Sequence, residues 1–346
     1  LARMLAKHGV NFNNFDLTEG MHELFDYDPS KDLEKLHTLY TSLPPETKEK
    51  IKLGSLDEIR TLPTAKDFLR EFNQTLLRFG HLSDSGNDFS TIPWRETPQM
   101  VLEMATTFES PQQTEGQKIK FSDLQVSGFR RVLVRLFYNR AREFRLMREK
   151  ISFLYTYGYG IFRYYYLAIG KIFVKEELLA DEEDIFYLTD GEIRSIIDGE
   201  ALTDLPKQLV NQHKRDMETY QNISLPTIIF GEELPPLDNI SSDILIGVPT
   251  SGGVYKGKVR VVAGLKDRNK VQDGDVLVVP YSDVSWTPLF RQAGAVIAES
   301  GGLLSHSSII AREYNIPAVV NVSGATRLAD ETIVTVDGHN GKVFIH

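Results

Sequence analysis

Residues 301–312 read Gly-Gly-Leu-Leu-Ser-His-Ser-Ser-Ile-Ile-Ala-Arg. The two glycines allow a sharp turn and a close approach of the backbone to a ligand. The serines around the histidine are helix N-cap candidates, and the apolar spacing that follows predicts a helix. His306 is therefore expected at a helix N-terminus, where free backbone N–H groups and the helix dipole favour a bound anion. The same field favours the neutral imidazole, which is the nucleophilic form.

The neighbours of His306 carry more information than the histidine itself. A lone histidine in a strand-to-helix turn can be an ordinary polar residue. Gly301, Gly302, His306 and the run 307–312, however, are similar to the phosphohistidine signature of the phosphoenolpyruvate-utilising enzymes, which include phosphoenolpyruvate synthase, pyruvate phosphate dikinase and the rifampin phosphotransferases. The resemblance implies that His306 is a catalytic nucleophile. Leu304 stands where the phosphoenolpyruvate and pyruvate enzymes usually have Thr, and it resembles the rifampin-phosphotransferase-like branch.

Four residues beside His306 are candidates to bind a phosphoryl group. Ser305 and Ser307 flank the imidazole with hydroxyl groups, while Gly301 and Gly302 form the preceding turn. Backbone N–H groups at such a turn hold phosphate without a metal ion. We therefore expect a phosphate-binding site with no metal.

Short runs of β-branched residues follow one another near the C-terminus. They are residues 259–262, 276–279, 295–298, 318–320 and 332–336. Glycine turns and the helix after His306 separate them, a pattern typical of a compact α/β domain. Residues 243–346 also resemble the swivelling phosphohistidine domain of the same family over nearly their whole length, so the resemblance implies that fold.

One tempting motif in this region is discounted. Residues 252–258 read as a glycine, four residues and then Gly-Lys, which is similar to a phosphate-binding P-loop. Val259 replaces the Ser or Thr that would bind magnesium, and a strand follows where the motif requires a helix. We expect no nucleotide site there.

The sequence of residues 1–230 predicts a mostly helical domain. The resemblance implies that this domain holds the acceptor of the phosphoryl group. A helix from Thr64 carries its apolar residues on one face, and Gly80 is its expected C-cap. Residues 231–242 hold glycine and prolines among short polar stretches, which is a linker composition. The expected fold is therefore multidomain, helical first and α/β at the C-terminal end.

A loop rich in turn-forming residues follows Gly80. Phe89 and Trp94 predict an ordered loop pinned by aromatic side chains. The alternative is functional, because Gly80-His81 and the later Trp94-Arg95-Glu96 resemble a Gly-His loop of the rifampin-phosphotransferase-like helical domain. His81 is thus a candidate acceptor-side residue. The interior, Ser-Asp-Ser-Gly-Asn-Asp, departs from the usual Arg-Gly-Pro-Gly-Glu of that family.

Five arginines recur at helical spacing on one stretch, Arg131, Arg135, Arg142, Arg145 and Arg148. The same stretch carries a stripe of apolar residues, which we expect to pack against other helices. Such a run of arginines is either a solvated face or an anion site, since Arg binds phosphate through paired N–H groups. In the resemblance, Arg148-Glu149 falls on an Arg-Glu pair of the helical domain's pocket. Arg142, Arg145 and Arg148 are the candidates to receive the phosphoryl group.

The aromatic run at residues 151–170 has two interpretations. It packs in a core, or it lines a pocket for a flat or apolar acceptor. Arg163 divides it into uncharged runs that are shorter than the roughly 18 apolar residues of a membrane span. We therefore expect no transmembrane helix.

Composition limits the partners. The formal net charge is -9, so nothing favours a nucleic acid or a membrane surface. Cys is absent, which excludes disulfides and thiolate metal sites and is consistent with a cytoplasmic location. The chain opens at Leu1 without Met, and we expect it to be part of a longer protein.

These observations predict a phosphotransferase of the kinase or dikinase type. The resemblance implies that an ATP-grasp domain, expected outside this sequence together with ATP and Mg²⁺, phosphorylates His306. The swivelling domain then carries the phosphoryl group to a small-molecule acceptor on the helical domain. We expect the fragment to bind no cofactor itself and to be inactive alone. The alternative is a non-catalytic phosphohistidine carrier or regulatory module.

Overall fold

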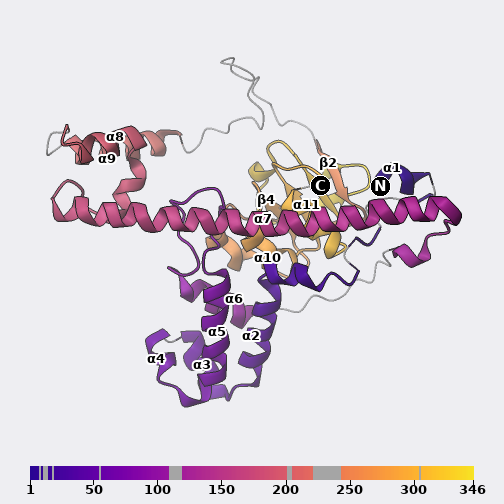
Figure 1. The fold of residues 1–346 in the computed structure, drawn as a ribbon, viewed down its shortest axis with the longest axis horizontal. Helices are drawn as coiled ribbons and strands as arrows, with labels where there is room; N and C mark the ends of the chain where they lie inside the picture. Colours follow the sequence, from indigo (N-terminus) through magenta and orange to yellow (C-terminus); the bar gives the residue numbers. More distant parts are fainter. Residues whose placement is uncertain are drawn as a thin grey trace. The chain divides into compact units, whose positions relative to one another are not determined.

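A computed structural model describes residues 1–7, 9–10, 15–17, 19–53, 56–108, 119–200, 205–220, 243–303 and 305–346. Figure 1 shows the fold, with the element labels used below. Two compact units are present. The first comprises residues 1–85, 93–154 and 238–346, and the second comprises residues 86–92 and 155–237. The predicted linker at 231–242 and Leu304 lie outside the described residues.

An eight-stranded mixed sheet forms the C-terminal part of the first unit. Its strand order is β1-β8-β7-β3-β4-β5-β6-β2, in which β3 to β6 are parallel neighbours and the other pairs are antiparallel. The bounds are β1 Ile244–Ile246, β2 Val248–Ser251, β3 Val254–Val261, β4 Val276–Val279, β5 Ala295–Ala298, β6 Ala318–Val320, β7 Ile333–Asp337 and β8 Lys342–Ile345. Each predicted run overlaps one of these strands or ends beside it, which confirms the α/β prediction.

Both faces of this sheet are covered, as parallel strands require. Successive side chains of β4 alternate, so Leu277 and Val279 join one buried cluster while Val276 and Val278 join another. The helix α11 (His306–Glu313) packs Ile310 into the first cluster. The short elements η7 (Val284–Trp286) and α10 (Thr287–Phe290) cover the same face. This arrangement places the start of α11 beside α10.

Short helices build the N-terminal part of the first unit. They are α1 Ala2–Ala6, η2 His22–Tyr27, α2 Ser30–Ser42, α3 Pro45–Leu53, α4 Leu56–Arg60, η3 Pro63–Ala65, α5 Lys66–Phe79, α6 Pro98–Thr107 and η4 Phe121–Asp123. The amphipathic α5 buries Phe68, Phe72 and Phe79 against α2 and α6, and Gly80 is its C-cap, as predicted. Val284 of η7 belongs to the same buried cluster, so the sheet part packs on the helical core.

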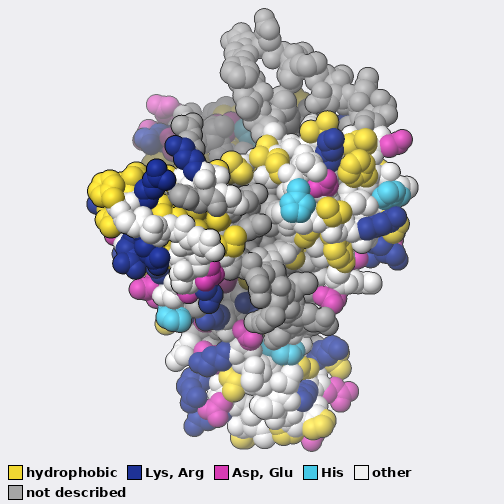
Figure 2. Space-filling model, turned by 90° about the vertical axis from the view of Figure 1, so that its right-hand side faces the viewer, with side chains coloured by type: hydrophobic (Ala, Val, Ile, Leu, Met, Phe, Trp, Pro, Cys, Tyr) yellow, Lys and Arg dark blue, Asp and Glu magenta, His cyan; other side chains and the backbone are white. Residues whose placement is uncertain are grey.

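The arginine-rich stretch forms one helix, α7 (Gly128–Lys175), that passes through both units. The prediction that its apolar stripe packs against other helices is wrong for most of the stripe, because Phe129, Phe144 and Ile151 are more than half exposed, while Val126, just before α7, is buried. No described element covers that face. Figure 2 shows hydrophobic side chains at the surface among charged ones.

The second unit contains the rest of α7 with η5 (Glu182–Tyr187), α8 (Asp190–Ile197) and α9 (Leu205–Tyr220). Phe89 stacks on Tyr166 with ring centroids 5.0 Å apart, and Arg163 is buried with an ion pair to Glu183 at 2.7 Å. The aromatic run therefore divides between a packed cluster and exposed rings such as Tyr164. Nowhere in the described ranges does a helix combine the length and apolar character needed to cross a lipid bilayer.

Candidate active site

His306 is the first residue of α11, directly after the N-cap Ser305, as the sequence predicts. The preceding turn closes on Gly302, whose carbonyl oxygen accepts from Ser305 N at 2.9 Å and from Ser308 Oγ at 2.7 Å. Gly301 has a φ of +133°, a conformation that other residues rarely adopt. The glycines therefore shape the turn that sets the position of the imidazole.

A threonine from α10 holds the imidazole. Thr287 Oγ1 donates to Val284 O at 2.7 Å and lies 3.1 Å from His306 Nε2. Because the hydroxyl proton is used on the carbonyl, Thr287 accepts from the ring, and the neutral imidazole carries its proton on Nε2. Its lone pair is then on Nδ1.

The half-buried imidazole is neutral at neutral pH, chiefly because the surrounding protein shields it from water. This desolvation, opposed by Asp283 and helped by Arg148 and Arg145, lowers the pKa of His306 to about 4. The sequence prediction of a neutral ring relied on the helix N-terminus, whereas desolvation is the larger cause here. A neutral ring is the form that can attack phosphorus.

The predicted phosphate-binding hydroxyls bond to protein groups in this structure. Ser305 Oγ donates to Gly302 O at 2.9 Å, and the buried Ser307 Oγ lies 2.6 Å from Ser282 Oγ. Both side chains thereby stabilise the turn and the first residues of α11. The backbone amides at the start of this helix are the remaining candidates for an anion.

The arginine stripe of α7 divides into two groups. Arg145 forms an ion pair with Glu313 at the end of α11, and Arg148 lies 3.3 Å from Glu149. Burial lowers the pKa of Arg145 to about 10, which still leaves it charged at neutral pH. Arg142 instead donates to Glu19 O at 2.7 Å, away from α11. Arg131 and Arg135 lie over the ring of Phe121.

His81 lies in the helical core rather than in the pocket beside His306. It is 2% exposed, and its ring meets Phe153 edge to face with centroids 4.5 Å apart. Burial, helped by Arg95, lowers the pKa of His81 to about 4. Arg95 closes the base of the loop by donating to Gly80 O at 3.1 Å. His81 is thus a packed core residue and does not line the cavity beside His306.

The loop after His81 contacts the segment that carries Thr287. Ser285 Oγ donates to Ser83 O at 2.6 Å, and Trp286 Nε1 donates to Asp84 O at 2.9 Å. The carboxylate of Asp84 accepts from Leu265 N at 3.0 Å. Residues 83–84 therefore fix η7 and, through it, Thr287.

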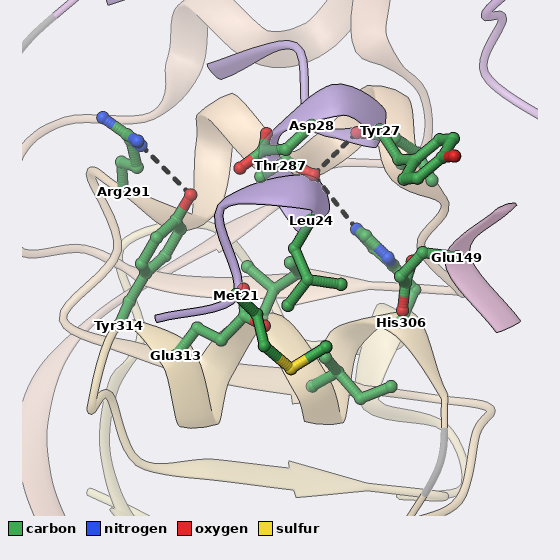
Figure 3. A pocket seen from close by; sticks show the side chains of 13 residues that line it. Met21, Leu24, Tyr27, Asp28, Glu149, Thr287, Arg291, His306, Glu313 and Tyr314 are labelled. Atoms are coloured by element: carbon green, nitrogen blue, oxygen red, sulfur yellow. Dashed lines mark hydrogen bonds between the residues drawn. The ribbon is translucent and has the colours of Figure 1, made fainter. Parts of the chain in front are cut away.

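A cavity of about 240 Å³ opens in front of His306. Figure 3 shows how its side chains surround the space between α11, α10, η2 and α7. The lining residues are Met21, Leu24, Tyr27, Asp28, Glu149, Val284, Thr287, Arg291, His306, Ile309, Ile310, Glu313 and Tyr314. Of the predicted site residues, His306 is among them, while Arg145 and Arg148 contact the lining carboxylates.

The cavity contains Glu149, which the resemblance paired with Arg148, and it adds two candidates that sequence reasoning missed, Tyr314 and Asp28. Burial raises the pKa of Glu149, although Arg148 and Arg145 oppose the shift. Burial also raises the pKa of Tyr314 to about 12, and Arg291 Nε donates to its hydroxyl at 3.1 Å. Asp28 joins from the N-terminal part. In the described part of the chain, no group of three or more His, Asp or Glu side chains is placed to hold a metal ion.

The chain is similar to known proteins along most of its length. Residues 271–341 match the family described as PEP-utilising enzyme, mobile domain. A rifampicin phosphotransferase of Bacillus cereus is 32% identical over 210 residues, which are 59% of this chain and 24% of that protein. A rifampicin phosphotransferase of Streptomyces sp. is 27% identical over 314 residues, 84% of this chain and 36% of that protein. An uncharacterized phosphotransferase of Bacillus subtilis is 26% identical over 325 residues, 85% of this chain and 38% of that protein.

Proposed function

We propose that this chain, a member of the phosphoenolpyruvate-utilising enzyme family through its mobile domain, acts in a phosphotransferase that carries a phosphoryl group on His306. The observation that carries the proposal is a neutral histidine at the start of a helix, facing a cavity whose carboxylates pair with Arg145 and Arg148. The chain spans 24% to 38% of the length of these relatives.

In the first half-reaction, an unprotonated ring nitrogen of His306 attacks the transferable phosphorus. A P–N bond forms as the bond to the leaving group breaks. With the proton on Nε2, as Thr287 holds it, Nδ1 has the lone pair, and attack through Nε2 requires the proton to move to Nδ1. ATP with Mg²⁺, bound by an ATP-grasp domain, is the proposed source of the phosphoryl group.

In the second half-reaction, an acceptor hydroxyl in the cavity attacks the phosphohistidine. The O–P bond forms, the P–N bond breaks, and the hydroxyl proton passes to a cavity carboxylate. Glu149 is the candidate, because burial raises its pKa and so makes it a better base. Arg145 and Arg148 stabilise the charge that spreads over the phosphoryl oxygens. Relay through His306 divides one difficult transfer into two easier ones.

Chemical phosphorylation of the chain tests the proposal without the missing donor. Incubation with phosphoramidate should label His306, and the label should be labile in acid and stable in base, as expected for a phosphoramidate linkage. The seven other histidines can also react, so the label is located by peptide mapping, and the peptide that contains residue 306 should lose it in His306→Ala. A His306 peptide that stays unlabelled while other histidines react would exclude this histidine as the carrier.

The alternative is a carrier that does not itself host an acceptor. The cavity at His306 favours the enzyme, because a carrier needs only an exposed histidine. A labelled chain that keeps its phosphoryl group with every small alcohol, but passes it to another protein, would favour the carrier.

A further inference from the structure

The cavity in front of His306 restricts what it can accept. Its volume of about 240 Å³ is below the roughly 300–1,000 Å³ that is usual for pockets of drug-sized ligands. Its apolar lining includes Met21 and Leu24, just before and within η2, and Ile309 and Ile310 of α11. The cavity therefore suits a small molecule with an apolar body and is too small for a macrocyclic antibiotic.

Three carboxylates line the cavity, those of Asp28, Glu149 and Glu313, and Arg291 is the one cation among the described lining residues. Arg145 and Arg148 lie behind the lining and pair with Glu313 and Glu149. The Arg291 guanidinium is already in use, since it donates to Tyr314, faces Glu34 at 3.8 Å and lies over the ring of Phe108. A carboxylate ligand such as pyruvate would therefore meet the negative charge of Asp28 here.

Asp28 differs from the other two lining carboxylates. Glu149 and Glu313 each have an arginine partner on α7, whereas within the described residues Asp28 has no ion pair and accepts only from Ser30 N at 2.9 Å. Its negative charge acts across the cavity, since it raises the pKa of both Glu149 and Tyr314. This carboxylate is available to a cationic group of a ligand.

We propose that the acceptor is a small amino alcohol with an apolar body, whose ammonium group pairs with Asp28 while its hydroxyl faces His306. This proposal rests on the phosphohistidine function above. Transfer is the same displacement as before: the acceptor oxygen replaces the imidazole nitrogen on phosphorus, and the hydroxyl proton passes to a carboxylate. Asp28 binds the amine and is a specificity residue.

The test compares four acceptors on one labelled protein. His306 is phosphorylated with phosphoramidate, excess donor is removed, and loss of phosphohistidine is followed by ³¹P NMR with phenylalaninol, 3-phenylpropan-1-ol, 3-phenyllactate or rifampicin. The first three share a phenyl body and differ in charge. Phenylalaninol should react fastest, about tenfold or more ahead of the neutral alcohol, as expected for a charged hydrogen bond.

Asp28→Asn should lower the phenylalaninol rate to that of 3-phenylpropan-1-ol and leave the neutral alcohol unaffected. The matched control is Asp26→Asn, because Asp26 lies two residues before Asp28, is exposed and pairs with Arg78 instead of lining the cavity. An equal loss with both alcohols in Asp28→Asn would make Asp28 a base and overturn its role in specificity.

The other outcomes separate the two proposals. Faster transfer to 3-phenyllactate or rifampicin from labelled His306 would overturn the amino-alcohol inference and leave the phosphohistidine function standing. A label that is stable with all four compounds would likewise overturn the inference. Failure of His306 to take any label would overturn the proposed function and this inference together.

Discussion

His306 Nε2 donates to Thr287 Oγ1 across 3.1 Å, because the threonine hydroxyl gives its own proton to Val284 O. Wild-type protein should therefore show His306 as the neutral Nε2–H tautomer at pH 7 in ¹⁵N NMR. Thr287→Val keeps the shape and removes the acceptor, so both tautomers should appear. Thr335→Val is the control, since Thr335 lies 2.9 Å from a different histidine, His346. An unchanged His306 spectrum in Thr287→Val would contradict the claim that Thr287 sets the tautomer of His306.

The low pKa of His306 predicts how labelling depends on pH. The free imidazole has a pKa near 6.5, whereas burial lowers that of His306 to about 4. Between these pH values His306 remains neutral, whereas free histidine becomes protonated and loses the ring lone pair that attacks phosphorus. The ratio of His306 labelling to N-acetylhistidine labelling by phosphoramidate, in one tube, should rise as the pH falls from about 6.5 to about 4. A constant ratio would mean that the ring titrates normally.

The buried His81 predicts a pH dependence of stability. Its pKa is lowered to about 4 in the folded protein, so between about 4 and 6.5 the unfolded chain binds more protons. The free energy of unfolding should therefore rise with pH across this window, by at most about 1.4 kcal/mol per pH unit for each such histidine. His306 contributes in the same direction.

Urea unfolding at pH 5 and pH 7 measures this effect. His81→Phe retains an aromatic ring against Phe153 and should reduce the difference in unfolding free energy between the two pH values. His346→Gln, at the exposed C-terminus, serves as the control. An equal difference in wild type and His81→Phe would show that His81 does not titrate abnormally.

Arg148→Ala should separate the two half-reactions. Labelling of His306 by phosphoramidate should stay close to wild type, while transfer to phenylalaninol should slow by about a hundredfold or more, as when one electrostatic stabiliser is removed. Arg145→Ala should act in the same direction. Arg142→Ala is the matched control. Arg142 lies on the same helix as Arg145 and Arg148, but it donates to Glu19 O and contacts no carboxylate of the cavity.

Two results would count against this role of the arginines. Equal loss of labelling and transfer would mean that Arg145 and Arg148 only support the fold. Transfer at the wild-type rate in both variants would make them structural ion-pair partners of Glu313 and Glu149.

The sequence predicts the buried strands well because a strand that is covered on both faces needs apolar residues at every position. β4 and β5 are buried at every position, so each reads as an uninterrupted apolar run. β1, β2 and β8 were not predicted. They are three or four residues long, partly exposed and paired at the ends of the sheet, so even the apolar Ile-Leu-Ile of β1 is too short to be told from loop sequence.

The site is predictable only where its residues are close in sequence. His306, its turn and its helix form one continuous stretch. Thr287 contacts the ring from 19 residues away, and Asp28 comes from the opposite end of the chain, so no local spacing relates them. The stripe of arginines predicts a helix face, but its division between the cavity and Phe121 depends on tertiary packing.

Residues 83 and 84 hold the Thr287 segment through their main chain. Both contacts from that segment end on the carbonyl oxygens of Ser83 and Asp84, whereas the Asp84 carboxylate accepts from Leu265 N in η6 (Leu265–Lys270). Every amino acid supplies such a carbonyl, so these two positions can change identity and still receive Ser285 and Trp286 as long as the backbone path is kept. The loop can therefore differ in sequence from the rifampin-phosphotransferase-like pattern without displacing His306, because these contacts depend on the path of the backbone and not on the side chains at positions 83 and 84.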